Sequence, residues 1–333
     1  MEPVEGDPNL DMNINTLNSC PFFQALHYNI PHGKKIRGLT SVNVFKKLIG
    51  EENLTPEIVR MGHILGWCIE ILHSDSLIID DILDKSETRR NKLCWYKLDH
   101  VQSVAINDAL MLRCAVNFII KKYFHHLPQY VDIIEFLYEP VFIAGIGELL
   151  GFCLSRDISQ FTMNAFKYLT FYKTSYFSFY TPIAMSMLLA GYKDQKAIKS
   201  VKTVCDEFGY FFQIQNDYRD LFSGDEMLSK PGTDIEEGKC TWLAVTVMED
   251  GTEQQKQILR ECYGKKDSES IELVKHVYKD MNFPQLYREY EKKASAHILK
   301  LVADIDNSIL RDIMFRLLND VSKALSAAKS SGK

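Results

Sequence analysis

Long stretches of this chain place apolar residues at helical spacing, and few stretches alternate as a strand requires. Glycine and proline interrupt this pattern at intervals, at Pro31-His32-Gly33, Leu127-Pro128, Gly191-Tyr192, Ser223 to Gly232 and Asn282-Phe283-Pro284. Helices with an apolar stripe must pack that stripe against other helices, so the pattern predicts an all-α bundle of long helices. The chain also has no GxGxxG turn, which argues against a βαβ fold.

The domain organisation is expected to be simple. A helical bundle can bury a core for a chain of 333 residues as one unit. No stretch has the composition of a flexible interdomain linker. We therefore expect a flexible N-terminus over 1–18, a single domain over 19–325 and a flexible tail over 326–333.

Composition excludes several functions. A net charge of -5 argues against a general nucleic-acid binder, which needs clustered lysine and arginine. The acidic start of the chain differs from a secretory signal or a transit peptide, and no uninterrupted apolar run reaches membrane-spanning length, so no stable membrane insertion is expected. Eight cysteines without a CxxC pair indicate free thiols and a cytoplasmic protein.

A first group of carboxylates, Asp80, Asp81 and Asp84, directly follows an apolar run. Asp80 and Asp84 lie four positions apart, so on a helix both project from one face. Like charges at that spacing repel, and on a partly buried helix they also lose hydration unless cations neutralise them. The alternative interpretation is a solvated helix face, which a lone DxxD usually marks.

A second group of oxygen-bearing side chains, Asn216, Asp217 and Asp220, ends another apolar segment. If the two helices face each other in a bundle, these oxygens form a site for Mg²⁺, which prefers carboxylates and keeps waters and substrate phosphates in its shell. Two such groups, each on an apolar helix, favour a metal site over a solvated face.

Basic residues accompany the acidic groups. Arg89 and Arg90 follow the first group closely, and arginine binds diphosphate oxygens through paired hydrogen bonds. Each basic residue taken alone is more commonly a surface residue, and the association with the acidic groups carries the prediction. Further candidate phosphate ligands are Lys34, Arg37, Lys173, Thr174, Lys230 and Lys239.

The segment Asp80 to Asp84, with Thr88-Arg89-Arg90 and Cys94-Trp95-Tyr96, resembles the first aspartate-rich region of farnesyl diphosphate synthases, the short-chain trans-isoprenyl diphosphate synthases. The resemblance continues through Tyr172 to Tyr180, Phe211 to Gln215, Gly232 to Ile235 and Lys239 to Trp242, and covers roughly residues 20 to 300. It implies an isoprenoid synthase-type bundle around a central cavity, a homodimer, and three magnesium ions, replaceable by manganese, that bind an isoprenoid diphosphate.

The resemblance also implies roles for individual residues. The expected metal ligands are Asp80, Asp81, Asp84, Asn216, Asp217 and Asp220. The expected ligands of the allylic diphosphate are Arg89, Lys173 and Lys230, with Thr174 and Lys239 as further contacts. Lys34, Arg37 and Arg90 match positions that hold isopentenyl diphosphate. The expected catalytic residues are Asp80, Asp84, Asn216, Lys173 and Gln213.

Some positions depart from the family pattern. Asn216 stands where the family has an aspartate, His73 replaces a glutamine of the isopentenyl site, and the basic tail that closes over that site is replaced by a nearly neutral one. Asp75 and Ser76 occupy positions where farnesyl synthases place bulky aromatics that stop chain growth. Their small size predicts a deeper cavity, unless Asp75 points to solvent or to a dimer partner.

Aromatic side chains are candidates for the wall of the cavity. Phe171, Phe177, Tyr180 and Phe212 could stabilise a travelling carbocation by cation–π contact, although such residues are more often simply core.

The departures lead to an expected function. We expect a terpene synthase, a lyase that ionises farnesyl diphosphate with Mg²⁺ to give a sesquiterpene. The main alternative is a farnesyl or geranylgeranyl diphosphate synthase, which the retained basic residues support. A third possibility is a catalytically silent helical binding protein, against which the costly acidic and basic constellation argues.

Overall fold

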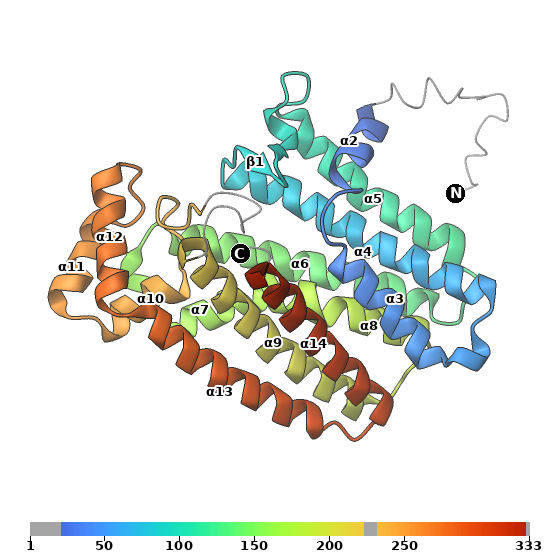
Figure 1. Cartoon of the computed structure of the whole chain (residues 1–333). Coiled ribbons are helices and arrows are strands. Elements are labelled where there is room, and N and C mark those ends of the chain that lie inside the picture. Colours follow the sequence, from blue (N-terminus) through green and yellow to red (C-terminus); the bar gives the residue numbers. More distant parts are fainter. Residues whose placement is uncertain (1–20, 223–231, 331–333) are drawn as a thin grey trace. The chain divides into compact units, whose positions relative to one another are not determined.

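The computed structural model describes residues 21–222 and 232–330, with side chains to residue 319. The expected N-terminus 1–18 and most of the expected connection Ser223 to Gly232 lie outside the described residues. Over the described residues the protein is all-α apart from one short hairpin, as predicted. The chain divides into two compact units, one formed by residues up to 35 with 70–118, and one formed by 36–69 with the residues from 119 onward (Figure 1). Whether 19–325 behaves as one domain stays a prediction.

The first unit contains four kinds of element. They are α2 (Pro21–Asn29), the second half of α4 (Pro56–Leu83), the strands β1 (Thr88–Arg89) and β2 (Lys92–Leu93) followed by the short helix η2 (Trp95–Lys97), and most of α5 (Val104–Phe124). Leu72 and Leu112 are buried at 1% and 0% exposure, so the facing stripes of α4 and α5 supply the core of this unit. Trp95 is buried as well, and its indole N–H donates to Asp108 over 2.8 Å.

The hairpin was not predicted. β1 and β2 pair antiparallel, with Thr88 opposite Leu93 and Arg89 opposite Lys92. Arg90 and Asn91 form the turn with positive φ values of 55° and 60°, the conformation of a two-residue hairpin loop of the primed type. Two-residue strands are too short to show alternation, and an arginine at positive φ is not a turn signal, so the sequence pattern could not reveal them.

The second unit holds the remaining elements. These are α3 (Ile36–Ile49), η1 (Glu51–Asn53), the first half of α4, α6 (Tyr130–Leu154), η3 (Ile158–Gln160), α7 (Met163–Thr170), the π-helix η4 (Phe171–Tyr180), α8 (Thr181–Leu189), α9 (Gln195–Phe222), α10 (Trp242–Asp250), α11 (Glu253–Cys262), α12 (Ser268–Asp280), α13 (Phe283–Ala303) and α14 (Ser308–Ser330).

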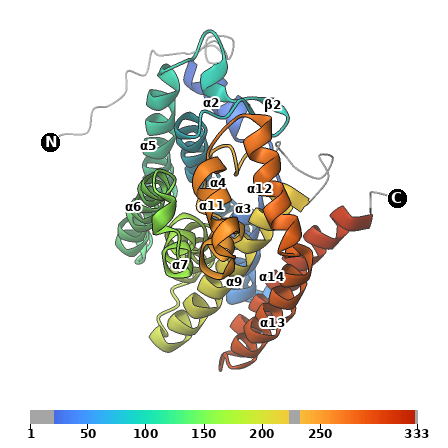
Figure 2. The same ribbon diagram turned by 90° about the vertical axis from the view of Figure 1, so that its left-hand side faces the viewer.

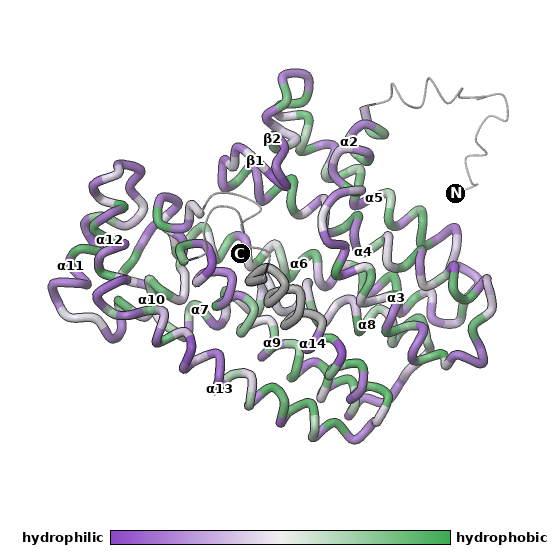
Figure 3. The backbone as a smooth tube through the Cα atoms, viewed as in Figure 1, coloured by the Kyte–Doolittle hydropathy of each residue, from purple (hydrophilic) through white to green (hydrophobic). Residues whose placement is uncertain are grey.

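The centre of the second unit is η4, which packs between α6 and α9. Glycines make this close approach possible, because a Cβ on Gly147 of α6 would lie 2.6 Å from the backbone nitrogen of Lys173, and one on Gly209 of α9 would lie 2.4 Å from the Cα of Ser175. Around this centre α3 packs on α8, α13 on α9, and α11 on α12. Figure 2 shows α11 beside α12. Hydrophobic and hydrophilic turns interleave along α12 and α13, as amphipathic helices require (Figure 3).

The predicted breaks between helices agree with the structure where it describes them. Leu127 and Pro128 separate α5 from α6, Gly191 at φ 69° separates α8 from α9, and Asn282 at φ 54° directly precedes α13. The breaks between α3 and α4, α6 and α7, α10 and α11, α11 and α12, and α13 and α14 were not predicted. At the other end, α14 extends through Ser330, and the alanines of this segment favour helix. The flexible tail over 326–333 stays a prediction.

One described helix, α6, is long and apolar enough to cross a membrane by length and composition. The apolar run of α6 is interrupted by Asp132, Glu135, Glu139 and Glu148, and the expected lack of stable membrane insertion stays a prediction. Five large apolar residues of α6 are exposed, namely Val131 at 59%, Tyr138 at 55%, Phe142 at 72%, Leu149 at 64% and Phe152 at 46%. Their spacing of 7, 4, 7 and 3 places them on one face of the helix.

Candidate functional site

The first acidic group lies at the carboxyl end of α4 in the first unit. Arg89 of β1 donates from Nη2 to Asp80 Oδ2 over 2.8 Å and from Nε to Asp81 Oδ1 over 2.9 Å. The aspartates thus acquire a positive partner, as their spacing predicted. Asp81 is 4% exposed, and burial raises its pKa while Arg89 opposes the rise. Burial works against the charge of Arg89, but the hydrogen bonds and charges of Asp81 and Asp80 outweigh it and raise its pKa.

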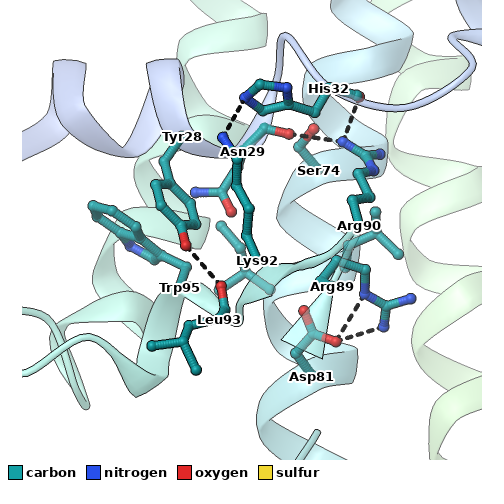
Figure 4. Close-up of a pocket in the computed structure, with 12 residues that line it drawn as sticks. Tyr28, Asn29, His32, Ser74, Asp81, Arg89, Arg90, Lys92, Leu93 and Trp95 are labelled. Carbon is teal, nitrogen blue, oxygen red and sulfur yellow. Dashed lines mark hydrogen bonds and ion pairs between the residues drawn. The ribbon is translucent and has the colours of Figure 1, made fainter. Parts of the chain in front are cut away.

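A small pocket next to this group is lined by α2, α4 and the hairpin (Figure 4). Arg90 donates to the backbone carbonyls of Asn29 and His32, which fixes the loop after α2. Lys35 donates to the carbonyls of Ile30 and His32. Side chains from two distant sequence positions thereby form one basic corner of the first unit.

His32 belongs to this basic corner. Its Nε2 lies 2.8 Å from the ammonium group of Lys92. The charge of Lys92, followed by loss of hydration and the charges of Lys35 and Arg90, lowers the pKa of His32. An imidazole surrounded by cations is a site at which a multivalent anion would be favourable. Lys34 is exposed beside it, on the same loop.

Asp75 lies one and a half turns before Asp80 and is fully buried. Arg113 of α5 binds it through two hydrogen bonds, Nε to Oδ2 at 2.9 Å and Nη2 to Oδ1 at 3.1 Å. Ser76 adds a hydroxyl contact to Asp75 Oδ1 at 3.2 Å. Asp75 therefore does not point to solvent, and the structure provides a partner that the sequence pattern did not suggest.

The second acidic group lies near the end of α9 in the second unit. Asn216 is exposed and Asp220 is half-buried, whereas Asp217 is 4% exposed. Asp217 accepts hydrogen bonds from Gln213 Nε2 and from the backbone N–H of Trp242, each over 2.8 Å. Burial, together with the nearby charge of Asp234, raises the pKa of Asp217 well above its usual range.

Asp220 faces the segment that follows the second acidic group. Its Oδ2 accepts from the backbone N–H of Asp234 over 3.3 Å. Lys239 lies 3.8 Å from Asp234 and forms an ion pair with Glu237. Among the described residues, this end of α9 is thus acidic with Lys239 beside the acidic group.

The other candidate ligands of the second unit already have partners. Lys173 of η4 pairs with Glu148 of α6 over 2.9 Å, and Thr174 donates to Gln213 Oε1 over 2.7 Å. Arg37 of α3 donates to Ser178 of η4 over 2.6 Å. Lys230 lies outside the described residues.

The candidate cavity aromatics belong to the core. Phe171, Tyr180 and Phe212 take part in one hydrophobic cluster, and Phe177 is 4% exposed. Phe212 meets Phe179 edge to face at 5.3 Å. The core interpretation fits these contacts, and contact with a substrate stays a prediction.

The described residues contain no three acidic, histidine or cysteine side chains that already converge as a metal cage. The donor set nevertheless suits magnesium, since carboxylate and amide oxygens are its preferred ligands and it takes most of its shell from water and phosphate. Asp80, Asp84, Asn216 and Asp220 carry such oxygens. Whether the two acidic groups face each other stays a prediction.

Sequence reasoning missed several residues of these sites. Arg113, Glu148 and Trp242 hold Asp75, Lys173 and Asp217 respectively, yet each lies 25 or more positions away in sequence from the residue it holds. Long-range pairing of this kind has no signal in a single sequence. A buried carboxylate needs a positive partner, so a buried position for Asp75 would have predicted a nearby arginine or lysine.

Comparison with known proteins gives a consistent family. Residues 21–281 match the family described as polyprenyl synthetase. Similar proteins include three named farnesyl pyrophosphate synthase. That of Saccharomyces cerevisiae is 37% identical over 92% of this chain and 89% of its own length. That of Artemisia annua is 39% identical over 85% and 82%, and that of Murgantia histrionica 35% over 89% and 73%.

These comparisons overturn the expected function. The expectation of a terpene synthase, and hence of a lyase that makes a sesquiterpene, is wrong, because the similar proteins are farnesyl pyrophosphate synthases over most of the chain. The expectation gave too much weight to a few departures such as Asn216 and His73. An amide oxygen can replace a carboxylate oxygen as a magnesium ligand, so Asn216 does not by itself change the reaction.

Proposed function

Because this chain belongs to the polyprenyl synthetase family, we propose that it is a prenyltransferase that joins isopentenyl diphosphate to an allylic diphosphate, with farnesyl diphosphate as the product. The observation that carries the proposal is the arrangement of the first unit. Asp80 and Asp81 are held by Arg89, and the basic corner of His32, Arg90 and Lys92 lies beside them. Such a site can hold both a metal-bound and a metal-free diphosphate.

Arg89 has the central role in this proposal. It donates hydrogen bonds to Asp80 and Asp81 in the structure, and its guanidinium can bind diphosphate oxygens instead once cations occupy the carboxylates. Magnesium, three ions in our proposal and replaceable by manganese, supplies positive charge that stabilises the departing diphosphate. Asp80, Asp84, Asn216 and Asp220 would hold these ions.

The basic corner is proposed as the site of isopentenyl diphosphate. Lys34, Arg90 and Lys92 supply full charges, and His32 adds a ring whose protonation responds to a bound anion. Arg37 and His73 are proposed to complete this site. Lys173, Thr174, Lys230 and Lys239 are proposed as further ligands of the allylic diphosphate.

A second product, geranylgeranyl diphosphate, is favoured by one observation. Ser76 is a small residue at a position where a bulky aromatic would limit chain length, and it does not fill space as an aromatic would. The buried Asp75 and Arg113 pair beside it sets the polarity of this part of α4. Product analysis separates the two lengths.

We also propose a homodimer in the cytoplasm. The exposed stripe of α6, at Val131, Tyr138, Phe142 and Leu149, is the kind of apolar face that a second copy would cover. In the first unit α5 exposes its own stripe at Val104, Met111 and Phe118, seven residues apart. Seven cysteines in the described part of the chain are free thiols, which suits a reducing compartment.

The test is a product assay. The purified protein is incubated with Mg²⁺, isopentenyl diphosphate and either dimethylallyl or geranyl diphosphate, and the products are dephosphorylated and analysed by mass spectrometry. We expect C15 products if the enzyme makes farnesyl diphosphate, and C20 products if it makes geranylgeranyl diphosphate. A matched tube holds farnesyl diphosphate alone. This tube is analysed without dephosphorylation. A hydrocarbon or alcohol formed there, without condensation in the first tubes, would overturn the proposal.

A further inference from the structure

Asp217 differs from its neighbours in the second acidic group. Both of its carboxylate oxygens already accept a hydrogen bond, Oδ1 from Gln213 Nε2 and Oδ2 from the backbone N–H of Trp242, each at 2.8 Å. It is 4% exposed, whereas Asn216 one position earlier is exposed. Each of these oxygens keeps a further lone pair, but the side chain is enclosed by protein, whereas magnesium keeps waters and substrate phosphates in its shell and needs an accessible oxygen.

The contact with Gln213 extends into a chain of hydrogen bonds. An amide has one oxygen and one NH₂ group, so a neighbour that only accepts determines which way the amide is turned. The carboxylate of Asp217 accepts from the NH₂ of Gln213, which leaves its oxygen to accept from the Thr174 hydroxyl at 2.7 Å. Asp217 thereby sets the orientation of two side chains, one of them on η4.

The contact with Trp242 connects the same chain to α10. Trp242 is the first residue of α10, and Thr241 caps that helix through a bond from the N–H of Ala244 at 3.2 Å. Asp217 satisfies another of the unpaired N–H groups at this helix start. A negative side chain is also favourable at the positive end of a helix.

We propose that Asp217 is a positioning residue, which holds Gln213, Thr174 and the start of α10 in register, and that Asn216 and Asp220 are the metal ligands of the second group. The proposal rests on the proposed function for its catalytic readout, because the ordering of Gln213 and Thr174 matters to a reaction at η4. Residues that orient others in this way typically change activity about ten- to a hundredfold when replaced.

The test exchanges the two hydrogen-bonding partners. In Asp217→Asn an NH₂ group faces the NH₂ of Gln213, and in Gln213→Glu two carboxylates face each other, so each single variant loses the contact. In the double variant Gln213→Glu with Asp217→Asn, the carboxylate and the amide have changed places. The oxygens of the introduced glutamate can accept from the NH₂ of the introduced asparagine and from the Thr174 hydroxyl. The oxygen of the introduced asparagine can still accept from the N–H of Trp242.

We expect each single variant to lower kcat about ten- to a hundredfold and the double variant to be more active than either single variant. The Mg²⁺ concentration for half-maximal rate should stay close to that of wild type in all three variants, since the proposed ligands Asn216 and Asp220 are unchanged. Asp220→Asn is the comparison variant, for which this concentration should rise. A rise in Asp217→Asn that persists in the double variant would show that Asp217 is a ligand and overturn the proposal.

A second measurement separates this proposal from the proposed function. Thermal unfolding without substrate, and Mg²⁺ binding measured calorimetrically with inorganic pyrophosphate, need no turnover. If the wild type forms no diphosphate with a longer chain than its substrates, the proposed function fails. A thermal unfolding midpoint that is lowered in both single variants and restored in the double variant would still support the positioning role. A double variant that is unfolded or no more stable than the single variants would contradict it.

Discussion

At the scale of the residue, the structure shows how the chain tolerates carboxylates on apolar helices. Arg89 pairs with both Asp80 and Asp81, and Arg113 neutralises Asp75. The need for positive partners could be predicted from the spacing of the aspartates, because like charges one turn apart repel. The identity of Arg113 could not, because it is 38 positions from Asp75 in sequence.

The buried pair gives a stability prediction. In Arg113→Met, Asp75 loses its cation inside the protein, and we expect the free energy of unfolding at pH 8 to fall by about 3 kcal/mol. Burial already raises the pKa of Asp75 and Arg113 opposes the rise, so the variant raises it further. The folded variant then binds more protons than the unfolded chain, and the deficit should shrink as pH falls. Urea unfolding at pH 8 and pH 5.5 measures both effects.

The matched control removes both charges. Asp75→Leu with Arg113→Met leaves no unpaired carboxylate, and it should be more stable than Arg113→Met alone at pH 8. A deficit in Arg113→Met that is independent of pH would show that lost packing, not the buried charge, is its cause.

His32 gives a prediction about pH. The charge of Lys92, then lost hydration, Lys35 and Arg90 lower its pKa, so at neutral pH the ring is uncharged. A bound anion places negative charge beside the ring and favours its protonated form. Inorganic pyrophosphate without metal should therefore raise the pKa of His32. The measurement is an NMR titration of the imidazole, with His32→Gln to assign the signal.

Two lysine variants check the cause. Lys92→Met should raise the pKa of His32 in the free protein, whereas Lys275→Met on α12 should leave that value unchanged. If pyrophosphate fails to move the titration of His32, the basic corner does not bind the anion.

At the scale of the element, prediction succeeded where periodicity was long and failed where it was short or altered. The 28-residue helices α4 and α9 could be predicted, and the acidic groups lie near their carboxyl ends as expected. The hairpin at Thr88 to Leu93 could not. The π-helical conformation of η4 could not be predicted either. Its residues fit an α-helical pattern closely, and a π-helix differs in its backbone hydrogen bonds, which join residues five apart and not four apart.

The contact between α6 and η4 gives an element-scale prediction. A methyl group on Gly147 would lie 2.6 Å from the nitrogen and 2.8 Å from the Cα of Lys173, and backbone cannot move aside as a side chain can. Gly147→Ala should therefore lower the free energy of unfolding by about 1–3 kcal/mol and reduce activity by displacing Lys173. Gly145→Ala is the control on the same helix.

A Cβ at Gly145 meets nothing within 4 Å in the described part of the chain, so that substitution should be neutral or stabilising by up to about 1 kcal/mol. Urea unfolding and the condensation rate are measured for both variants. Equal stability of the two variants would mean that α6 and η4 can separate without cost.

At the scale of the whole molecule, the all-α class and the family could be predicted from the sequence, whereas the reaction was predicted wrongly from a few departures. The exposed stripe on α6 gives a prediction at this scale. Phe142 is 72% exposed in its middle, and Phe142→Glu places a charge where a second copy would pack. We expect the wild type to sediment as a dimer and this variant to shift toward monomer.

Leu273→Glu is the matched control, since Leu273 is 42% exposed on α12, away from the α6 stripe in sequence and in element. It should leave the sedimentation of the wild type unchanged. A dimer that survives Phe142→Glu would place the interface on another face.

The ten π-helical residues from Phe171 to Tyr180 have a consequence for how this chain can change over generations. Substitutions within them alter chemistry one side chain at a time. Deletion of a residue between Lys173 and Ser175 would instead rotate every later residue of the continuous helix by roughly a quarter of a turn relative to Lys173, since each residue of a helix turns the chain by a fixed angle. Gly209 could then no longer meet Ser175. Insertions and deletions should therefore be rarer here than in the connecting loops. Distant relatives can then be aligned over this segment without gaps.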